Sequence, residues 1–310
     1  MAITASMVKE LREMTGAGMM DCKKALTATN GNMDEAVEFL RKNGQAKAEK
    51  KAGRIAAEGV VCALVKEDKV ASIVEVNSET DFVAKNGDFR AYVAKVTEQA
   101  ANTSAADMDA FMAEPWIEDE TKTVKDALVE KIAVIGENLN IRRFEKVETE
   151  GCVVEYIHGG GRIGVLVDAD TEVVNDEVRA CLKNVAMQVA ALNAKYVSQA
   201  DVDPEYLAHE KEILLAQIMN DPKESQKPEK VINGMVMGRI NKQMKEICLL
   251  DQVYVRAEDG KQSVGKYIEE VGKANGTKIT VKKFIRFETG EGLEKKVDDF
   301  AAEVAAQAGM

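Results

Sequence analysis

Three glycines form the part of this sequence that most resembles a cofactor motif. Gly159, Gly161 and Gly164 satisfy the spacing GxGxxG of dinucleotide-binding loops. Such a site needs a strand before the glycines and a helix after them, because the helix N-terminus faces the pyrophosphate. Here the glycines are followed by Val165-Leu166-Val167, which reads as a strand. We therefore predict a hairpin turn, in which glycines supply positive φ angles.

The other residues capable of chemistry do not form a recognisable catalytic or metal motif. His158 and the three glycines after it resemble the oxyanion loop of esterases, but the chain has no GxSxG nucleophile elbow. It also has no GxxxxGK[ST], HExxH or EF-hand sequence. The chain has two histidines and five scattered cysteines, which are Cys22, Cys62, Cys152, Cys181 and Cys248. This pattern predicts reduced thiols and no metal site. We expect no enzymatic centre and no cofactor.

Composition narrows the class of protein further. The chain has 310 residues, with 42 Lys and Arg against 53 Asp and Glu, which gives a net charge of -11. An acidic chain is a poor candidate for direct nucleic-acid binding, because phosphate contacts need clustered positive charge. Apolar residues make up 45%, enough for two or three folded units. No apolar run approaches the ~18 residues of a membrane span, and the N-terminus lacks a secretory leader. A cytoplasmic protein is expected.

Residues 1–44 are predicted to form a three-helix module. Gly16 and Gly18 end the first helix, and Asn30-Gly31 closes the second. Asn32 and Glu35 form a capping-box pattern that opens the third helix, which Gly44 is expected to end. The basic stretch that follows, Gln45 to Arg54, is predicted to be a solvated linker helix, within a linker assigned to residues 45–58.

The centre of the chain is predicted to be a duplicated β-hairpin and helix. Alternating apolar residues from Gly59 predict two strands with a turn at Glu67-Asp68, followed by a helix. The same order returns from Gly151, and aligning Gly59 with Gly151 places Val74 on Leu166. We interpret this as an internal duplication. The core N-subdomain is assigned to residues 59–148, and the core C-subdomain to residues 149–200 and 249–290.

The remaining segments complete an α+β fold. Between the halves, helices are expected at 105–112 and 123–135 and a strand at 140–147. Residues 201–248 are predicted to form an antiparallel helical hairpin, with a methionine stripe that suits a partner surface or ordinary packing about equally. Strands are expected at 253–255 and 278–287. A C-terminal helix is expected at 293–308, within a module of residues 291–310.

One segment differs between the two halves. After its second strand the first half continues as Thr80-Asp81-Phe82-Val83, whereas the second half has no aromatic residue at that place. Strand-to-helix connections tend to project their side chains. The alternative is that Thr80 or Asp81 caps a helical turn and Phe82 tucks beneath it. An exposed Phe beside a carboxylate is typical of a protein-binding site.

Several motifs of six or more residues resemble the elongation factor Ts family, in the family's order and across essentially the whole chain. They are TGAGMMDCKKAL at Thr15–Leu26, TDFVAKN at Thr80–Asn86, NLNIRR at Asn138–Arg143, HGGGRIGVLV at His158–Val167 and FIRFETGEGLEKK at Phe284–Lys296. The resemblance implies an N-terminal module of the ubiquitin-associated type, a dimerisation role for the hairpin at 201–248 and a C-terminal helix module. It also implies that the partner is elongation factor Tu, a GTPase that holds GDP through phosphate contacts and Mg²⁺.

By this resemblance, the chain promotes GDP release by displacing Mg²⁺ in its partner. Asp81 and Phe82 would intrude beside the metal site, while Thr80 and Val83 set the conformation of the segment. Weaker contacts are implied for Met19, Met20, Lys23 and His158, although the two methionines are equally good core residues. A homodimer through the helical hairpin is possible on the same basis. No metal or cofactor is expected in this chain, and neither nucleic acid nor membrane is expected as a partner.

A non-catalytic helical scaffold or chaperone-like binding protein is the competing interpretation. It shares the small N-terminal bundle, the methionine-rich hairpin and the acidic charge. The two interpretations differ in their dependence on nucleotide. GDP weakens the grip of an exchange factor on its partner, but it does not weaken that of a scaffold.

Overall fold

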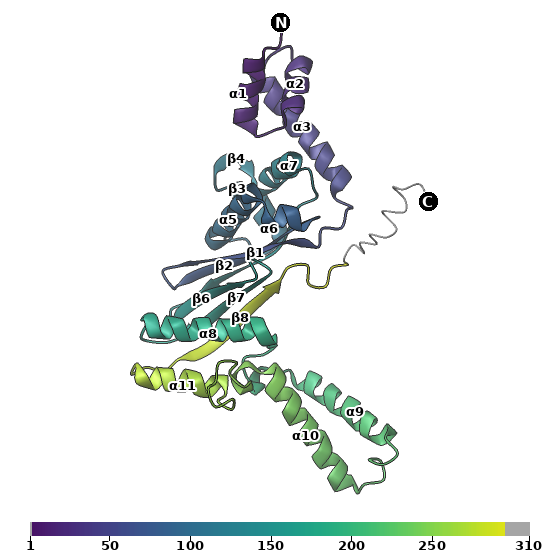
Figure 1. Cartoon of the computed structure of the whole chain (residues 1–310), viewed down its shortest axis with the longest axis vertical. Coiled ribbons are helices and arrows are strands. Elements are labelled where there is room, and N and C mark those ends of the chain that lie inside the picture. Colours follow the sequence, from purple (N-terminus) through teal and green to yellow (C-terminus); the bar gives the residue numbers. More distant parts are fainter. Residues whose placement is uncertain (1, 295–310) are drawn as a thin grey trace.

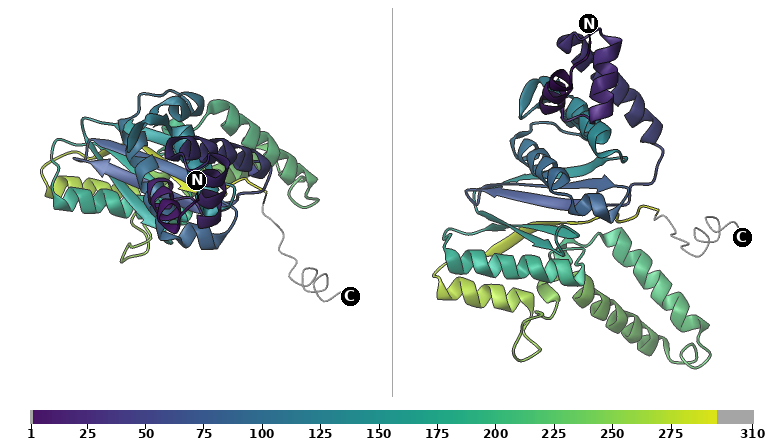
Figure 2. Two further views of the ribbon diagram at one scale, coloured as in Figure 1. Left: turned by 90° about the horizontal axis from the view of Figure 1, so that it is seen from above. Right: turned by 45° about the horizontal axis from the view of Figure 1, so that its top comes forward.

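A computed structural model describes residues 2–294, over which the chain forms eleven α-helices and eight β-strands. The three N-terminal helices lie at one end, two sheets are stacked in the middle, and a helical hairpin extends at the other end (Figures 1 and 2). The mixture of helices and antiparallel sheets agrees with the predicted α+β class. The predicted C-terminal helix lies outside the described residues apart from Leu293 and Glu294. No helix in residues 2–294 is long and apolar enough to cross a membrane.

The N-terminal module consists of three helices, which are α1 (Ala5–Thr15), α2 (Met19–Ala28) and α3 (Met33–Lys51). Gly16 ends α1 with a φ of 66°, and the Asn32 side chain opens α3 by accepting a hydrogen bond from the Glu35 amide. The helices enclose a small apolar cluster around Leu11 and Leu26. Both helix boundaries were predicted from these capping residues.

The predicted end of the third helix at Gly44 is wrong. Helix α3 continues without a break to Lys51, so the predicted linker helix is the last part of α3 and ends before Arg54. Gly44 is buried, and a Cβ atom there would lie 3.5 Å from the Cβ of Ala133 in helix α7 (Val124–Ile135). The missing side chain therefore lets α3 pack closely on α7. The Lys51 ammonium donates to the Gly136 carbonyl at the end of α7.

The first core half is a three-stranded antiparallel sheet with helices on one face. Its strand order is β1-β2-β5. Glu67 and Asp68 both have positive φ in the predicted turn between β1 and β2. The elements are β1 (Glu58–Lys66), β2 (Val70–Ser78), β5 (Asn140–Glu148), α4 (Asp81–Lys85), α5 (Gly87–Asn102), α6 (Met108–Ala113) and α7. A small hairpin of β3 (Pro115–Trp116) and β4 (Asp119–Thr123) was not predicted.

The second core half repeats this plan with the strand order β6-β7-β8. Its elements are β6 (Cys152–His158), β7 (Ile163–Asp170), β8 (Thr280–Glu288), α8 (Asp176–Leu192) and α11 (Val264–Ala274). Gly159, Gly160 and Gly161 all have positive φ in the β6–β7 turn, which confirms the predicted hairpin and excludes a dinucleotide loop. The predicted strand at 253–255 is wrong, because Tyr254 is buried in a loop that pairs only through a bridge from Val253 to Ser263. Helix α11 was not predicted.

The central strands of the two halves have a β-bulge at the same place. Strand β2 has a bulge after Glu75, which faces Arg143, and β7 has one after Asp168, which faces Lys283. Val74 therefore corresponds to Val167, not to Leu166 as the sequence alignment implied. The alignment slips because the β6–β7 turn is one residue longer than the β1–β2 turn.

The sheets pack face to face, and helices cover their outer faces (Figure 2). Val61 and Ile73 of the first sheet meet Leu166 and Phe287 of the second. Gly164 allows the closest approach, because a Cβ there would lie 2.4 Å from a Val61 methyl group. The two halves thus share an apolar cluster between the sheets, in addition to the core that each half has under its own helices.

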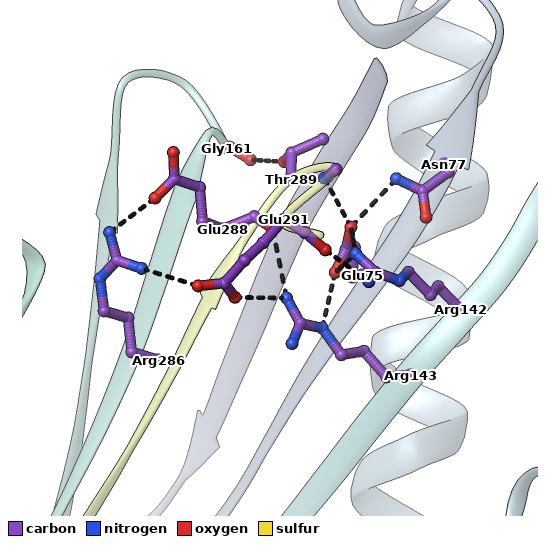
Figure 3. A network of polar contacts seen from close by, with 10 residues as sticks. Glu75, Asn77, Arg142, Arg143, Gly161, Arg286, Glu288, Thr289 and Glu291 are labelled. Carbon is purple, nitrogen blue, oxygen red and sulfur yellow. Dashed lines mark hydrogen bonds and ion pairs between the residues drawn. The ribbon is translucent and has the colours of Figure 1, made fainter. Parts of the chain in front are cut away.

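A buried carboxylate joins the two halves at the edge of this core (Figure 3). Glu75 is completely buried and accepts hydrogen bonds from Arg142 at 3.0 Å and from the Arg143 Nε at 2.6 Å. It also accepts from the Asn77 amide at 3.0 Å and from the backbone of Gly290, beyond β8, at 2.8 Å. Buried charges are stable when they are paired and fully hydrogen-bonded in this way.

The helical hairpin consists of α9 (Pro204–Asn220) and α10 (Glu229–Ile247), flanked by 3₁₀ turns at Gln199–Asp201 and Leu249–Asp251. Its interior includes Ile218 and Ile240. The predicted methionine stripe is divided, because Met244 is buried in this interior whereas Met219 and Met237 are exposed.

Candidate functional site

The segment Thr80–Val83 forms the start of α4, directly after β2. Thr80 is the N-cap residue, and its hydroxyl accepts a hydrogen bond from the Val83 amide at 3.4 Å. Asn86 ends α4 and opens α5, where its side chain accepts from the amides of Asp88 and Phe89 at 2.8 and 3.1 Å. This five-residue helix is therefore capped at one end and fastened to a long core helix at the other.

Phe82 projects from this helix into solvent. Its exposed fraction is 82%, the highest of the large hydrophobic residues in the described part of the chain. Val83 is half-buried against the apolar core of the first half and Ala84 is buried, so they hold the inner side of the helix. The alternative in which Phe82 tucks beneath the turn is excluded in this structure. The arrangement is a single aromatic side chain presented from a packed support.

Asp81 forms an ion pair with a lysine of its own helix. Its carboxylate lies 2.6 Å from the Lys85 ammonium one helical turn later, and both side chains are more than half exposed. The hydrogen bond from Lys85 holds the pKa of Asp81 below its ordinary value. Asp81 is therefore ionised at neutral pH and paired within its own helix.

Glu137 fastens the beginning of α4 and was missed by the sequence analysis. It follows α7, and its carboxylate accepts hydrogen bonds from the amides of Glu79 and Thr80, both at 3.1 Å. The Thr80 hydroxyl donates to the same carboxylate at 2.7 Å. The residues are 57 positions apart in the sequence, so no local pattern connects them.

The turn after His158 is linked to the same helix through Arg90. The guanidinium of Arg90 donates to the Ala84 carbonyl at 2.9 Å and to the Gly160 carbonyl at 2.8 Å. His158 itself is exposed, and its Nδ1 lies 3.0 Å from the Tyr156 hydroxyl. The structure thus connects the support of Phe82 with the β6–β7 turn.

Met19, Met20 and Lys23 lie on α2 of the N-terminal module, not beside the α4 segment. The exposed fractions of the two methionines are 59% and 63%, and Lys23 is also exposed. Their role as core residues, which the sequence left open, is wrong, because α2 buries Cys22 and Leu26 instead.

The described residues offer no metal site and no activated thiol. Across residues 2–294, no group of three or more His, Cys, Asp and Glu side chains could hold a metal ion. Burial raises the pKa of Cys152, Cys181 and Cys248 to about 11. These thiols stay protonated at neutral pH, whereas nucleophilic cysteines act as thiolates.

Comparison with known proteins gives one consistent result. A family model described as Elongation factor TS matches residues 79–291, a range that includes the α4 segment. The chain is 53% identical over 309 residues to elongation factor Ts of Clostridium perfringens strain 13, with 99% of each chain covered. It is 52% identical over 307 residues to the protein of that name from Clostridium tetani, covering 98% of this chain and 99% of the relative. For Clostridioides difficile strain 630 the identity is 51% over 306 residues, covering 98% of each.

Proposed function

The chain belongs to the elongation factor Ts family of translation elongation factors, and from this premise we propose that it accelerates the release of GDP from elongation factor Tu. The observation that carries the proposal is Phe82, which is 82% exposed on a helix whose other side chains are packed or paired. Aromatic side chains are enriched in the cores of protein interfaces, so an exposed phenylalanine on a capped and packed helix is a suitable contact for a partner. The segment lies inside the region that the family model matches.

In the proposed mechanism, Phe82 inserts beside the Mg²⁺ site of the partner GTPase. Mg²⁺ demands near-ideal octahedral oxygen geometry, so a small displacement of its surroundings weakens its binding. Asp81 disturbs the polar groups there, while Thr80 and Val83 hold the segment in place. Without the metal, the GDP phosphates lose their main counter-charge and GDP leaves. In this scheme the chain promotes exchange in its partner and catalyses no reaction of its own.

The rest of the molecule would keep Phe82 seated. Met19, Met20 and Lys23 are exposed on the N-terminal module and His158 on the β6–β7 turn, so all four can make secondary contacts. Arg90 supports a common action of His158 and Phe82, because it hydrogen-bonds to the backbone of both supporting segments. The exposed Met219 and Met237 make the helical hairpin the proposed contact for a second copy of the chain. No direct nucleic-acid contact is proposed.

Reciprocal binding distinguishes an exchange factor from a scaffold or chaperone-like binder. If the chain weakens GDP binding by some factor, GDP weakens binding of the chain by the same factor. The affinity for elongation factor Tu should be measured by titration calorimetry without nucleotide and with saturating GDP. We expect binding to weaken by at least about tenfold with GDP, a coupling of ~1.4 kcal/mol. Equal affinities would favour the scaffold.

A further inference from the structure

We propose that Glu137 is a positioning residue for nucleotide exchange, which holds the beginning of α4 so that Phe82 is presented in one orientation. This inference rests on the proposed function. Glu137 does not belong to the exposed segment, and no sequence motif marks it. It acts through three donors, which are the Glu79 amide, the Thr80 amide and the Thr80 hydroxyl.

The two carboxylate oxygens divide these donors between them. Oε2 accepts both amides at 3.1 Å, and Oε1 accepts the hydroxyl at 2.7 Å. A charged acceptor makes stronger hydrogen bonds than a neutral one. Glu137 therefore fixes the backbone of the last two residues before α4 and also the side chain of Thr80.

The Thr80 hydroxyl links this clamp to the helix that carries Phe82. A hydroxyl has one hydrogen to donate and two lone pairs that accept. Because its hydrogen points to Glu137, a lone pair is available to the Val83 amide at 3.4 Å. Removing the carboxylate frees the hydroxyl to rotate, and the cap that orders the first turn of α4 is weakened.

Glu137 is itself held by its neighbours. It follows Gly136, which ends α7 with a φ of 86° and accepts a hydrogen bond from Lys51. The next residue returns the contact, because the Asn138 amide donates to the Glu79 carboxylate at 2.6 Å. The two segments are thus clamped reciprocally, and the reference point is the end of a core helix.

The second half of the core shows which part of this arrangement belongs to the duplicated fold. There the strand-to-helix connection is also tied to the segment before the third strand. The tie there runs between side chains, with the Thr171 hydroxyl 3.2 Å from that of Thr277, the Asn175 amide group donating to Asn275 at 2.8 Å and the Asn275 amide group donating to the Glu177 carboxylate at 3.0 Å. Both halves therefore connect the start of their helix to the segment before the third strand. A carboxylate that accepts backbone amides, as Glu137 does, occurs at this place in the half that carries Phe82.

The expected effect is on the maximal exchange rate more than on binding. Other modules still bring the partners together, but Phe82 reaches its place only when α4 is ordered. We expect Glu137→Ala to lower the maximal rate of GDP release about tenfold. The half-saturating concentration should change less than about threefold, because the clamp itself makes no proposed contact with the partner.

The experiment compares Glu137→Ala with Glu137→Gln and with Glu130→Ala in the full chain. Glutamine should restore most of the rate, because its amide oxygen accepts both backbone amides and its NH₂ group can donate to the Thr80 hydroxyl. Glu130→Ala is the matched control, because it removes a carboxylate of α7, the helix that Glu137 follows, and this carboxylate pairs with Lys122 at 2.9 Å and not with the α4 segment. Each rate should be measured again in a Phe82→Ala background, where loss of Glu137 should have no further effect.

A second readout does not require elongation factor Tu. Hydrogen exchange of the Glu79, Thr80 and Val83 amides should be faster in Glu137→Ala and unchanged in Glu130→Ala. Unaltered hydrogen exchange at these amides in Glu137→Ala would overturn the clamp, whether or not the wild-type chain accelerates GDP release. If the clamp is present and wild type accelerates GDP release, a normal rate in Glu137→Ala would overturn the positioning role alone. An undiminished effect in the Phe82→Ala background would also overturn it.

Discussion

Replacing Phe82 by alanine should slow stimulated GDP release without weakening the fold. The side chain is 82% exposed, so its removal leaves no cavity in the core. Thr80, Val83 and Ala84, which hold α4 in place, remain unchanged. Exposed substitutions of this kind usually alter the free energy of unfolding by less than about 0.5 kcal/mol.

The size of the effect follows from the area that Phe82 has available to bury. A phenylalanine buries ~150–250 Å² in an interface, and most of that area is free here. At ~25 cal/mol per Å², and subtracting about 70 Å² for the β-carbon that alanine retains, the lost contribution is about 2–4 kcal/mol. If all of it acts in the transition state for GDP release, the rate falls roughly 30- to 1,000-fold.

Stopped-flow release of a fluorescent GDP analogue from elongation factor Tu measures this rate directly. Val255→Ala is a suitable control, because it removes an apolar side chain that is 49% exposed in the second core half. It should release GDP at the wild-type rate, and urea unfolding should give the same stability for both variants. A wild-type rate in a folded Phe82→Ala protein would remove Phe82 from the mechanism.

Three further predictions concern the support of the site. Glu75→Ala should lower the free energy of unfolding by about 3 kcal/mol in urea titrations, because it leaves two arginines without their buried carboxylate; an unchanged midpoint would contradict the role of this ion network. Gly59→Ala should lower the free energy of unfolding by about 3 kcal/mol in the same titrations, because the φ of Gly59 is 131° and a Cβ would lie 2.2 Å from a carbonyl oxygen of β2. Gly53→Ala is the control, because a Cβ at Gly53 meets open space, and it should leave the stability unchanged. Asp81→Ala should reduce GDP release less than Phe82→Ala does. Because Lys85 lowers the pKa of Asp81, the ratio of the wild-type to the Asp81→Ala release rate should stay constant from roughly pH 6 to 8. The ratio should decrease only as the pH falls through that lowered pKa. A decrease in the ratio above pH 6 would point to another group.

Elements with their own start and stop residues could be predicted from the sequence. Asn32 marks the start of a helix because its side chain accepts a hydrogen bond from a backbone amide of the first turn. Gly16 marks the end of a helix because, without a side chain, it adopts a positive φ easily. Gly44 misled the prediction because a glycine also permits close helix packing, and only the position of Ala133 on α7 reveals that use. The short alternation at 253–255 suggested a strand, but no neighbouring strand pairs with it beyond the one bridge from Val253.

The candidate site could be predicted from the sequence only in part, because some of its contacts join residues that are distant in the sequence. Phe82 stands out because the duplication lacks an aromatic residue in its second copy. Glu137 could not be found this way, because its partners are distant in sequence and its role depends on the end of α7 lying beside the end of β2. The slip between Val74 and Leu166 likewise came from one extra turn residue, which a fixed repeat length cannot accommodate.

Release of GDP from elongation factor Tu at substoichiometric amounts of this chain tests the central claim most directly. One molecule of an exchange factor acts on many partners in turn, so a small fraction of the chain should release the whole of the bound nucleotide at an accelerated rate. Release limited to an amount equal to the added chain, or release at the spontaneous rate with a folded chain, would contradict the proposed exchange activity.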